Sequence, residues 1–576
     1  MARTGSAEMK VRVTPNLIDR AVGFIDPAAG LARLENRARL SATSSVFGGG
    51  AGGYRGAQPD RAKRRGWFAR ARSANADTLP GSDRMRAEQR DAAMNQPIAT
   101  AAINRKVTFT IGTGLMAIPA INGAALGLTA DEQERWEQRL ATDFDAYLAS
   151  KDVDAARQAT GYGVQAIVER GTITSGDMLA LRVMPEDQPG RVTATAWQLV
   201  EADRLRNPPT ITDGARNPAT GNIVAGGVEV DQHWSPVAYW ILKQHPGDLQ
   251  LVNAASLMPE RIDAWDTKLQ LPRVVHVYKK ERAEQVRGVG LLATVLEPLK
   301  MVSDLSDAEL FAAVMSAMIA VVYKSPGATP MPEPDYGDED SLAEPAEGGA
   351  AYDIPAAAPT YKFESGSVME IDSEAEVEIK SPGRPNSAFN PFFEAIVRQI
   401  GAAIGVPAGV LMLMFNSSYT ASKAELEALY MDVRAERAWF GGDWCVPTYV
   451  CFVAEKVARG DYAMPGFFSD LDIRAAWTGV DWRGDGKITL NPAQEANGYK
   501  IRQDNGWQTG EEITAELTGG SFRQNVARRG REHRAWVAEG LPVAVSPGTP
   551  SANAGSGGVE DGTPPADPKR KDNQDA

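Results

Sequence analysis

The sequence predicts an α+β fold that is mainly helical, in which long helices flank a β-rich middle. Apolar residues recur every three or four positions over most of the chain, but the period changes to two between about 178 and 280. In addition, an apolar helix at 388–405 stops before a polar loop and a second, longer helix. The 576 residues are enough for three or four units of ~150 residues each.

The composition is that of a folded protein in a reducing compartment. Hydrophobic residues make up 43% of the chain, and the two cysteines, Cys445 and Cys451, lie on different faces of one predicted helix. We therefore expect no disulfide. The four histidines lack ligand spacing, so no metal site is expected. The first ten residues do not have the pattern of a secretory signal.

Charge and hydropathy exclude two further classes of protein. The net charge of -13 argues against a protein that grips nucleic acid over its whole surface, but fits one past which nucleic acid must slide. The longest apolar run, Leu310 to Tyr323, has 14 residues, whereas a bilayer needs ~20. We expect this run to be a packed helix and the protein to have no membrane segment.

The first 60 residues predict a flexible arm, because residues 41–60 are rich in Gly, Ser and Ala. The stretch from Arg61 to Arg72 is basic and contains Trp67 and Phe68. It could contact nucleic acid or another anionic partner, or it could be a solvated arm that touches the protein's own acidic surface.

Helices are expected before and after the β-rich middle. Pro97 suits a first helical turn, and Trp136, Leu140, Phe144 and Leu148 form one apolar stripe. The long helix at 290–323 is followed by an acidic stretch rich in Pro, Ala and Gly, which predicts disorder. The expected helices are 82–95, 97–110, 129–170, 290–323, 388–405, 421–458 with a kink at Pro447, 491–505 and 510–538, with strands at 115–121, 178–280 and 361–379 and a disordered tail from 546.

The junction between two of these helices is the most informative segment. Asn390-Pro391 predicts a helix start, and Gly405 and Pro407 predict its end, since glycine favours a left-handed helix terminus and proline lacks an N–H. The sequence from Val410 to Thr420 is therefore expected to be a loop or a short extended piece. Its start is too apolar for a simple linker.

Motifs for catalysis and cofactor binding are weak. Gly112-x-Gly114-x-x-Ala117 and Gly288-x-Gly290-x-x-Ala293 have dinucleotide spacing, but neither lies directly between a strand and a helix. The chain has no P-loop, and the calcium-like turn at Asp481 has Pro492 where a ligating Glu should stand. We expect that the protein is not an enzyme and binds no cofactor. The alternative is a nucleotide-binding enzyme that uses the Gly288/Gly290 turn.

Several segments, taken in order, resemble one family of virion proteins. They are Asp19 to Pro27, Asn95 to Pro97, Ile111 to Leu115, Gln198 to Leu205, Gly227 to Asp231, Pro236 to Tyr239, Val275 to Tyr278, Gln285 to Gly288, Ile404 to Pro407, Ser418 to Lys423 and Asn491 to Ala496. On these segments the chain, from about 15 to 540, resembles the lambda-like family of tailed-phage portal proteins. Another virion connector or a scaffold protein is the remaining alternative, against which the β-rich middle argues.

The resemblance implies a homo-oligomeric ring, expected to be a dodecamer, at one vertex of the capsid. Through such a ring the terminase large subunit drives double-stranded DNA, which later leaves by the same channel, and a head-tail adaptor docks on it. Capsid and scaffold proteins would be further partners. The protein would be assembled in the host cytoplasm and reside in the virion.

The resemblance also implies a division of the chain. Its parts would be a flexible arm (1–60), the wing (61–289), a stem helix (290–323), the clip with the acidic insert (324–387), a second stem helix (388–405), the tunnel loop (406–422), the spine helix of the wing (421–475), crown helices (476–545) and a disordered tail (546–576). Polar side chains of the tunnel loop are the candidates for contact with passing DNA: Asn416, Ser417, Ser418, Tyr419, Thr420, Ser422 and Lys423. The apolar Val410 to Phe415 would anchor the loop against neighbouring parts. Alternatively, the loop is a helix connection buried against a neighbour.

Overall fold

The computed structural model describes residues 71–185, 188–248, 258–318, 321–325, 368–372, 389–414 and 418–540. The chain divides into two units, Met1–Arg72 and Ser73–Ala576, and every helix and strand below belongs to the second. The expected flexible arm, most of the basic stretch, the acidic insert and the disordered tail lie outside the described residues and stay predictions.

The helices predicted at 82–95 and 97–110 have these bounds in the structure. α3 (Ala74–Thr78) precedes α4 (Ser82–Asn95) and α5 (Pro97–Thr110), and Pro97 occupies the first turn of α5 as expected. The short strand β1 (Met116–Pro119) confirms the predicted alternation there. A single turn of helix, α6 (Gly123–Leu126), follows.

The helix predicted at 129–170 is two helices, α7 (Ala130–Ala149) and α8 (Gly161–Ser175). The Asp154 carboxylate accepts hydrogen bonds from the backbone N–H groups of Ala156, Gln158 and Ala159 at 2.9, 2.9 and 3.1 Å. An aspartate side chain that binds nearby N–H groups competes with the helical pattern. The prediction of one helix was wrong for this reason.

The β-rich middle is confirmed and forms three antiparallel sheets, with strand orders β11-β2-β3, β4-β5-β6-β7-β8 and β10-β9. Leu179, Val200, Tyr239 and Val274, from four strands, share one apolar core. The elements are β2 (Asp177–Val183), β3 (Ala196–Glu201), the 3-10 turn η3 (Ala202–Arg204), β4 (Ala215–Arg216), β5 (Ile223–Ala225), β6 (Val228–Val230), β7 (Pro236–Ile241), β8 (Glu260–Asp263), β9 (Trp265–Asp266), β10 (Leu271–Pro272) and β11 (Val274–Tyr278).

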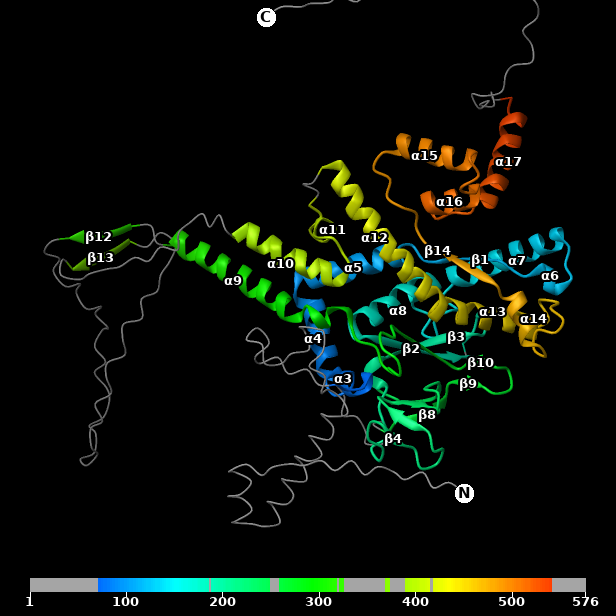
Figure 1. Cartoon of the computed structure of the whole chain (residues 1–576), viewed down its shortest axis with the longest axis horizontal. Coiled ribbons are helices and arrows are strands. Elements are labelled where there is room, and N and C mark those ends of the chain that lie inside the picture. Colours follow the sequence, from blue (N-terminus) through cyan, green and yellow to red (C-terminus); the bar gives the residue numbers. More distant parts are fainter. Residues whose placement is uncertain are drawn as a thin grey trace, which may run out of the picture. The chain divides into compact units, whose positions relative to one another are not determined.

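The helix predicted at 290–323 is shorter than expected. It begins as the 3-10 turn η5 (Leu291–Thr294), continues as α9 (Leu296–Met318), and gives way to β12 (Val321–Ser325). β12 pairs in parallel with β13 (Val368–Asp372), in the stretch where strands were expected. Pairing with a segment more than forty residues away overrides the local helical pattern. α9 lies beside α10 (Phe389–Ile404) (Figure 1).

The long helix predicted at 421–458 contains one irregular turn. α12 (Tyr419–Phe440) passes through the π turn η6 (Gly441–Cys445) into α13 (Val446–Ala458). A proline lacks an N–H and clashes with the carbonyl four residues before it, so Pro447 explains why regular helical bonding fails just ahead of it. Cys445 and Cys451 are free thiols, and both are buried.

The C-terminal part joins the body through a strand. After α14 (Leu471–Trp477), β14 (Val480–Arg483) pairs antiparallel with β1. α15 (Pro492–Asp504) matches its prediction. The helix predicted at 510–538 is instead divided into α16 (Gly510–Thr518) and α17 (Phe522–Ala538), because Gly519 takes a left-handed φ of 70°.

Two further apolar cores hold the helices together. One is rich in aromatic side chains, among them Phe144, Trp444 and Phe452. The other gathers α5, α10 and α12 through residues such as Ile103, Ile400 and Val433. Among the described residues, no helix is both long enough and apolar enough to cross a bilayer.

Candidate functional site at the turn from α10 into α12

The chain reverses sharply where α10 ends. Gly405 has a φ of 70°, in the left-handed region that glycine adopts without strain. The N–H of Val406 donates to the carbonyl of Gly401 at 2.9 Å, which closes the turn. A Cβ atom on Gly401 would lie only 2.5 Å from the carbonyl oxygen of Val406. The predicted helix end at Gly405 is confirmed.

The segment after the turn is not the loop that we expected, because residues Ala408–Met412 form the short helix α11. Pro407 precedes this helix and its carbonyl accepts from the N–H of Leu411 at 2.9 Å. Proline ends one helix but is compatible with the start of the next, where its missing N–H is not needed. Val410 and Leu411 are buried in the subunit's own core, whereas Leu413 and Met414 are exposed.

The predicted channel residues that the structure describes lie at the start of α12. Ser418 is the N-cap and its hydroxyl accepts from the N–H of Ala421 at 3.4 Å, while Tyr419 and Thr420 are exposed. Ser422 is only 9% exposed and is part of the subunit interior, which the sequence did not show. Asn416 and Ser417 lie outside the described residues.

Ion pairs and a hydrogen bond tie this end of α12 to the C-terminal part of the chain. Lys423 Nζ lies 3.5 Å from a carboxylate oxygen of Glu495 on α15, and Lys487 pairs with Glu427. The Tyr430 hydroxyl accepts from the N–H of Ile488 at 2.6 Å. Of the predicted channel residues that the structure describes, Lys423 is therefore already paired, Ser422 is buried, and Ser418, Tyr419 and Thr420 face solvent.

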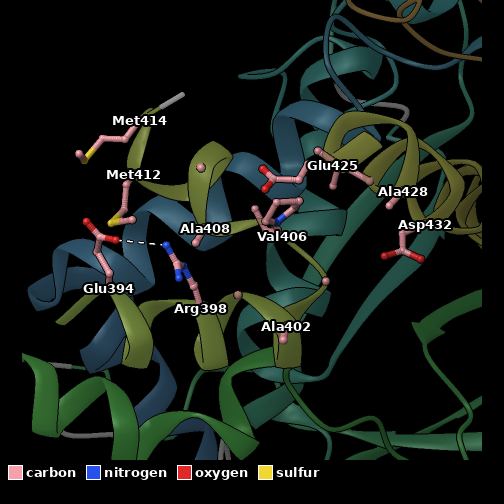
Figure 2. Close-up of a pocket in the computed structure, with 15 residues that line it drawn as sticks. Glu394, Arg398, Ala402, Val406, Ala408, Met412, Met414, Glu425, Ala428 and Asp432 are labelled. Carbon is pink, nitrogen blue, oxygen red and sulfur yellow. Dashed lines mark hydrogen bonds and ion pairs between the residues drawn. The ribbon is translucent and has the colours of Figure 1, made fainter. Parts of the chain in front are cut away.

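A groove of about 510 Å³ lies between α10, α11 and α12. Ala402, Val406, Met412 and Leu429 supply apolar lining. Figure 2 shows Glu394 and Arg398 on one side, joined by an ion pair of 3.2 Å, and Glu425 and Asp432 on the other. Sequence reasoning did not find these groups, although the spacing of Glu394 and Arg398, one helical turn apart, was a usable signal.

Charged groups lie close to the same turn; Lys106 is buried and Asp432 is exposed. A Cβ atom on Gly405 would lie 3.4 Å from Lys106 Nζ and 3.3 Å from a carboxylate oxygen of Asp432. Glu169 on α8 is fully buried near Glu436 of α12, which pairs with Lys279. Burial, and then the charge of Glu436, raise the pKa of Glu169 to about 8. α5, α8 and α12 therefore share an electrostatic network behind the turn.

The space next to the Gly288/Gly290 turn is filled by other residues of the protein. A Cβ atom on Gly288 would lie 1.8 Å from the carbonyl oxygen of Gly176, so glycine is needed for close backbone packing. The side chain of Gln89 accepts from the N–H of Leu292 at 3.1 Å, at the helix start where a nucleotide phosphate would bind. This arrangement does not support the alternative of a nucleotide-binding enzyme.

The residues around this turn are held by one buried ion pair. Arg287 pairs with Asp177 and also donates to the carbonyl oxygens of Ala202 and Gly226, both at 2.8 Å. Burial alone would raise the pKa of Asp177, but Arg287 and His276 together hold it well below its usual range. The Gln285-Val-Arg-Gly288 motif thus has a structural explanation.

One group of possible metal ligands occurs in the described residues. Ligand atoms of Glu201, Asp203 and His245 lie within 4.8 Å of one another. Arg90 already pairs with both carboxylates, and Arg86 lies 3.5 Å from Asp203. Because arginine balances the negative charge that a cation would need, we assign no metal to this group.

Comparisons with known proteins agree with the resemblance. The profile of the family described as "Phage portal protein, lambda family" matches residues 60–437. The chain is 22% identical over 523 residues to the portal protein of Escherichia phage N15, covering 87% of this chain and 94% of that protein. It is 21% identical over 512 residues to portal protein B of Escherichia phage lambda, covering 86% and 90%.

A solved structure, the neck of a native gene transfer agent particle computed with C12 symmetry, is also similar. Its identity is 12%, its TM-score 0.30, and the match covers 75% of this chain and 93% of that one. A TM-score this low carries no argument about the arrangement of subunits. The sequence profile, in contrast, spans well over half of the 576 residues, from the basic stretch to α12. The chain therefore belongs to the lambda family of phage portal proteins.

Proposed function

We propose that this portal protein forms the ring at one capsid vertex through which terminase drives double-stranded DNA into the head. The DNA leaves by the same channel, and a head-tail adaptor joins the ring. Family membership over residues 60–437 is the observation that carries the proposal. The ring would be a dodecamer in the virion, assembled in the host cytoplasm together with capsid and scaffold proteins.

We assign the parts of the ring to the elements of the fold. The wing would comprise the elements from α3 to β11, and α9 and α10 would be the stem helices. The clip would lie between them, with β12 and β13, and would face terminase and later the adaptor. α11 and the start of α12 would form the tunnel loop, the rest of α12 with α13 the spine of the wing, and α15 to α17 the crown.

Charge supports passage of DNA through such a ring. The net charge of -13 per chain, repeated around a ring, disfavours a deep electrostatic trap for phosphate. Tyr419 and Thr420 are exposed at the turn into α12 and offer hydroxyl groups rather than fixed positive charges. Such groups can contact the DNA backbone without holding it.

The oligomeric state tests the proposal. Native mass spectrometry and negative-stain imaging of the purified full chain should show rings with a central hole. A monomer or dimer under every condition of salt, concentration and temperature would contradict the proposal.

The role of the turn into α12 is tested by Thr420→Asp. Because Thr420 is exposed, rings should form as before, but a circle of added carboxylates should repel phosphate and lower DNA packaging several-fold. Thr142→Asp is the matched control, since Thr142 is an exposed threonine on α7. Packaging at the wild-type level in Thr420→Asp would remove this turn from the mechanism.

A further inference from the structure

The helix α17 carries a charge opposite to that of the whole chain. Its 17 residues contain five arginines, at 523, 528, 529, 531 and 534, and one acidic residue, Glu532. The chain as a whole has a net charge of -13. A basic helix on an acidic protein is a local feature that the net charge hides, and the sequence reasoning above did not detect it.

Among the described residues, only Arg523 of the five arginines of α17 has an ion-pair partner. Arg523 pairs with Glu137 of α7 at 3.1 Å. In the part of the chain that the structure describes, Arg528, Arg529, Arg531 and Arg534 have no ion pair, and all four are exposed. Several unpaired guanidinium groups in a row attract an anion from outside the subunit.

Three of these arginines share one face of the helix. Arg528, Arg531 and Arg534 recur every three residues, so their side chains follow one another along the helix. The exposed apolar residues Phe522 and Val526 lie on a different face. At 1.5 Å per residue the three arginines span ~9 Å of helix axis. DNA carries one phosphate per ~3.4 Å of axis on each strand, so this face matches the spacing of two or three phosphates.

We propose that the Arg528–Arg531–Arg534 face of α17 binds the phosphate backbone of double-stranded DNA without regard to sequence. Guanidinium groups bind phosphate with paired, charge-assisted hydrogen bonds, and contacts to phosphate carry no sequence information. The inference rests on the proposed function, since a ring that conducts DNA presents α17 with a duplex.

One feature favours DNA over the other anionic partner of a basic amphipathic helix, a membrane surface. Helices that lie on membranes need a broad apolar face next to the basic one. In α17 the apolar side is interrupted by Arg529, Gly530 and His533. The unpaired positive charge is therefore the dominant property of the helix.

The test compares duplex binding by the full-length protein and a variant with Arg528→Gln, Arg531→Gln and Arg534→Gln. The probe is a fluorescent 30-base-pair duplex of mixed sequence, titrated at salt concentrations from about 50 to 300 mM. We expect at least a tenfold loss of affinity at low salt. The slope of log K against log salt should fall by about 2 to 3, since each lost phosphate contact removes about 0.9.

Two control variants make the result specific. The first control is a triple variant that removes the same charge from exposed arginines elsewhere: Arg84→Gln, Arg135→Gln and Arg216→Gln. It should bind the duplex with an affinity within about twofold of wild type. Replacing the three α17 arginines by lysine keeps the charge and should preserve the salt slope. The inference is overturned if the glutamine variant of α17 binds like wild type, or if the control at 84, 135 and 216 loses as much.

Other outcomes identify a different partner. If both the glutamine and the lysine variant lose the ability to form rings, α17 is a contact between subunits. If the protein binds anionic vesicles but not the duplex, α17 is a membrane helix. Either result overturns the inference. If the wild-type protein forms rings that bind no duplex, this inference is overturned but the proposed function is not. Failure of the wild type to form rings would instead contradict the proposed function.

Discussion

At the scale of single residues, Glu169 is an unfavourably placed charge. Its side chain is 0% exposed, and neither carboxylate oxygen has a hydrogen-bond partner. Burial raises the pKa of Glu169 to about 8, the charge of Glu436 adds to this, and Lys279 and Lys106 oppose it. The folded protein therefore binds this proton more tightly than the unfolded chain, where a glutamate titrates near ~4.3.

This difference makes stability depend on pH in a defined direction. The contribution of Glu169 to stability is complete below pH ~4.3 and is lost as the pH rises to about 8. Replacing Glu169 by Gln removes the cost of burying a charge. We expect the variant to gain on the order of 2–4 kcal/mol in unfolding free energy, relative to wild type, between pH 4.5 and pH 8.

Thermal unfolding of wild type and Glu169→Gln from pH 4.5 to 8.5 measures this difference in stability. The difference between the two melting temperatures should widen as the pH rises. Glu134→Gln on the exposed surface of α7 is the control and should show no such trend. A gap that stays constant with pH would mean that Glu169 does not titrate in this range.

At the scale of elements, the reversal between α10 and α11 decides how the candidate site is presented. Gly405 supplies the left-handed residue, and Gly401 allows the returning chain to approach α10 closely. The neighbouring Val410 and Leu411 are buried and hold α11 against α5. The chain therefore turns from α10 into a short packed helix, α11, before α12 begins.

Gly405→Ala tests this turn. An alanine at a φ of 70° is strained, so we expect a loss of about 1–2 kcal/mol in unfolding free energy by chemical denaturation. Gly498→Ala on α15 is a control of opposite sign, because a Cβ atom there meets open space and alanine favours a helix, so a gain of about 0.4–1 kcal/mol is expected. Equal stability of Gly405→Ala and wild type would show that the turn adopts another conformation.

At the scale of the whole molecule, α9 exposes apolar side chains that the described residues of its own subunit do not cover. Leu310 and Phe311 are 65% and 67% exposed. Met301 and Val314 on the same helix are also exposed. Adjacent exposed apolar residues of this size mark a surface for association, and in a ring the partner is the next copy of the chain.

The variant Leu310→Ser with Phe311→Ser should therefore disrupt rings without unfolding the subunit. We expect at least a tenfold lower fraction of rings by native mass spectrometry. The melting temperature of the subunit should change little, because exposed side chains contribute within about 0.5 kcal/mol. Met94→Ser on α4 is the control, since Met94 is 74% exposed and lies on another helix. Rings that persist in the double variant would exclude α9 from the contact between subunits.

The sequence by itself determined the features that depend on neighbouring residues. Pro97 set the start of α5, Gly405 the end of α10, and alternation revealed the strands of the middle. Caps, prolines, glycines and periodicity act within a few residues, so one sequence shows them. The family was also recognised from ordered local motifs, and its profile matched.

Only the tertiary structure decided the features that depend on distant residues. β12 is a strand because β13 pairs with it, β1 pairs with β14 from the other end of the chain, and α11 is a helix because it packs on α5. Glu169 is likewise buried among groups far along the sequence, since the charges of Lys106, Lys279 and Glu436 act on it. Pairing and packing between distant segments override local propensity, and for this reason the predicted tunnel loop became a short helix, a cap and an exposed first turn.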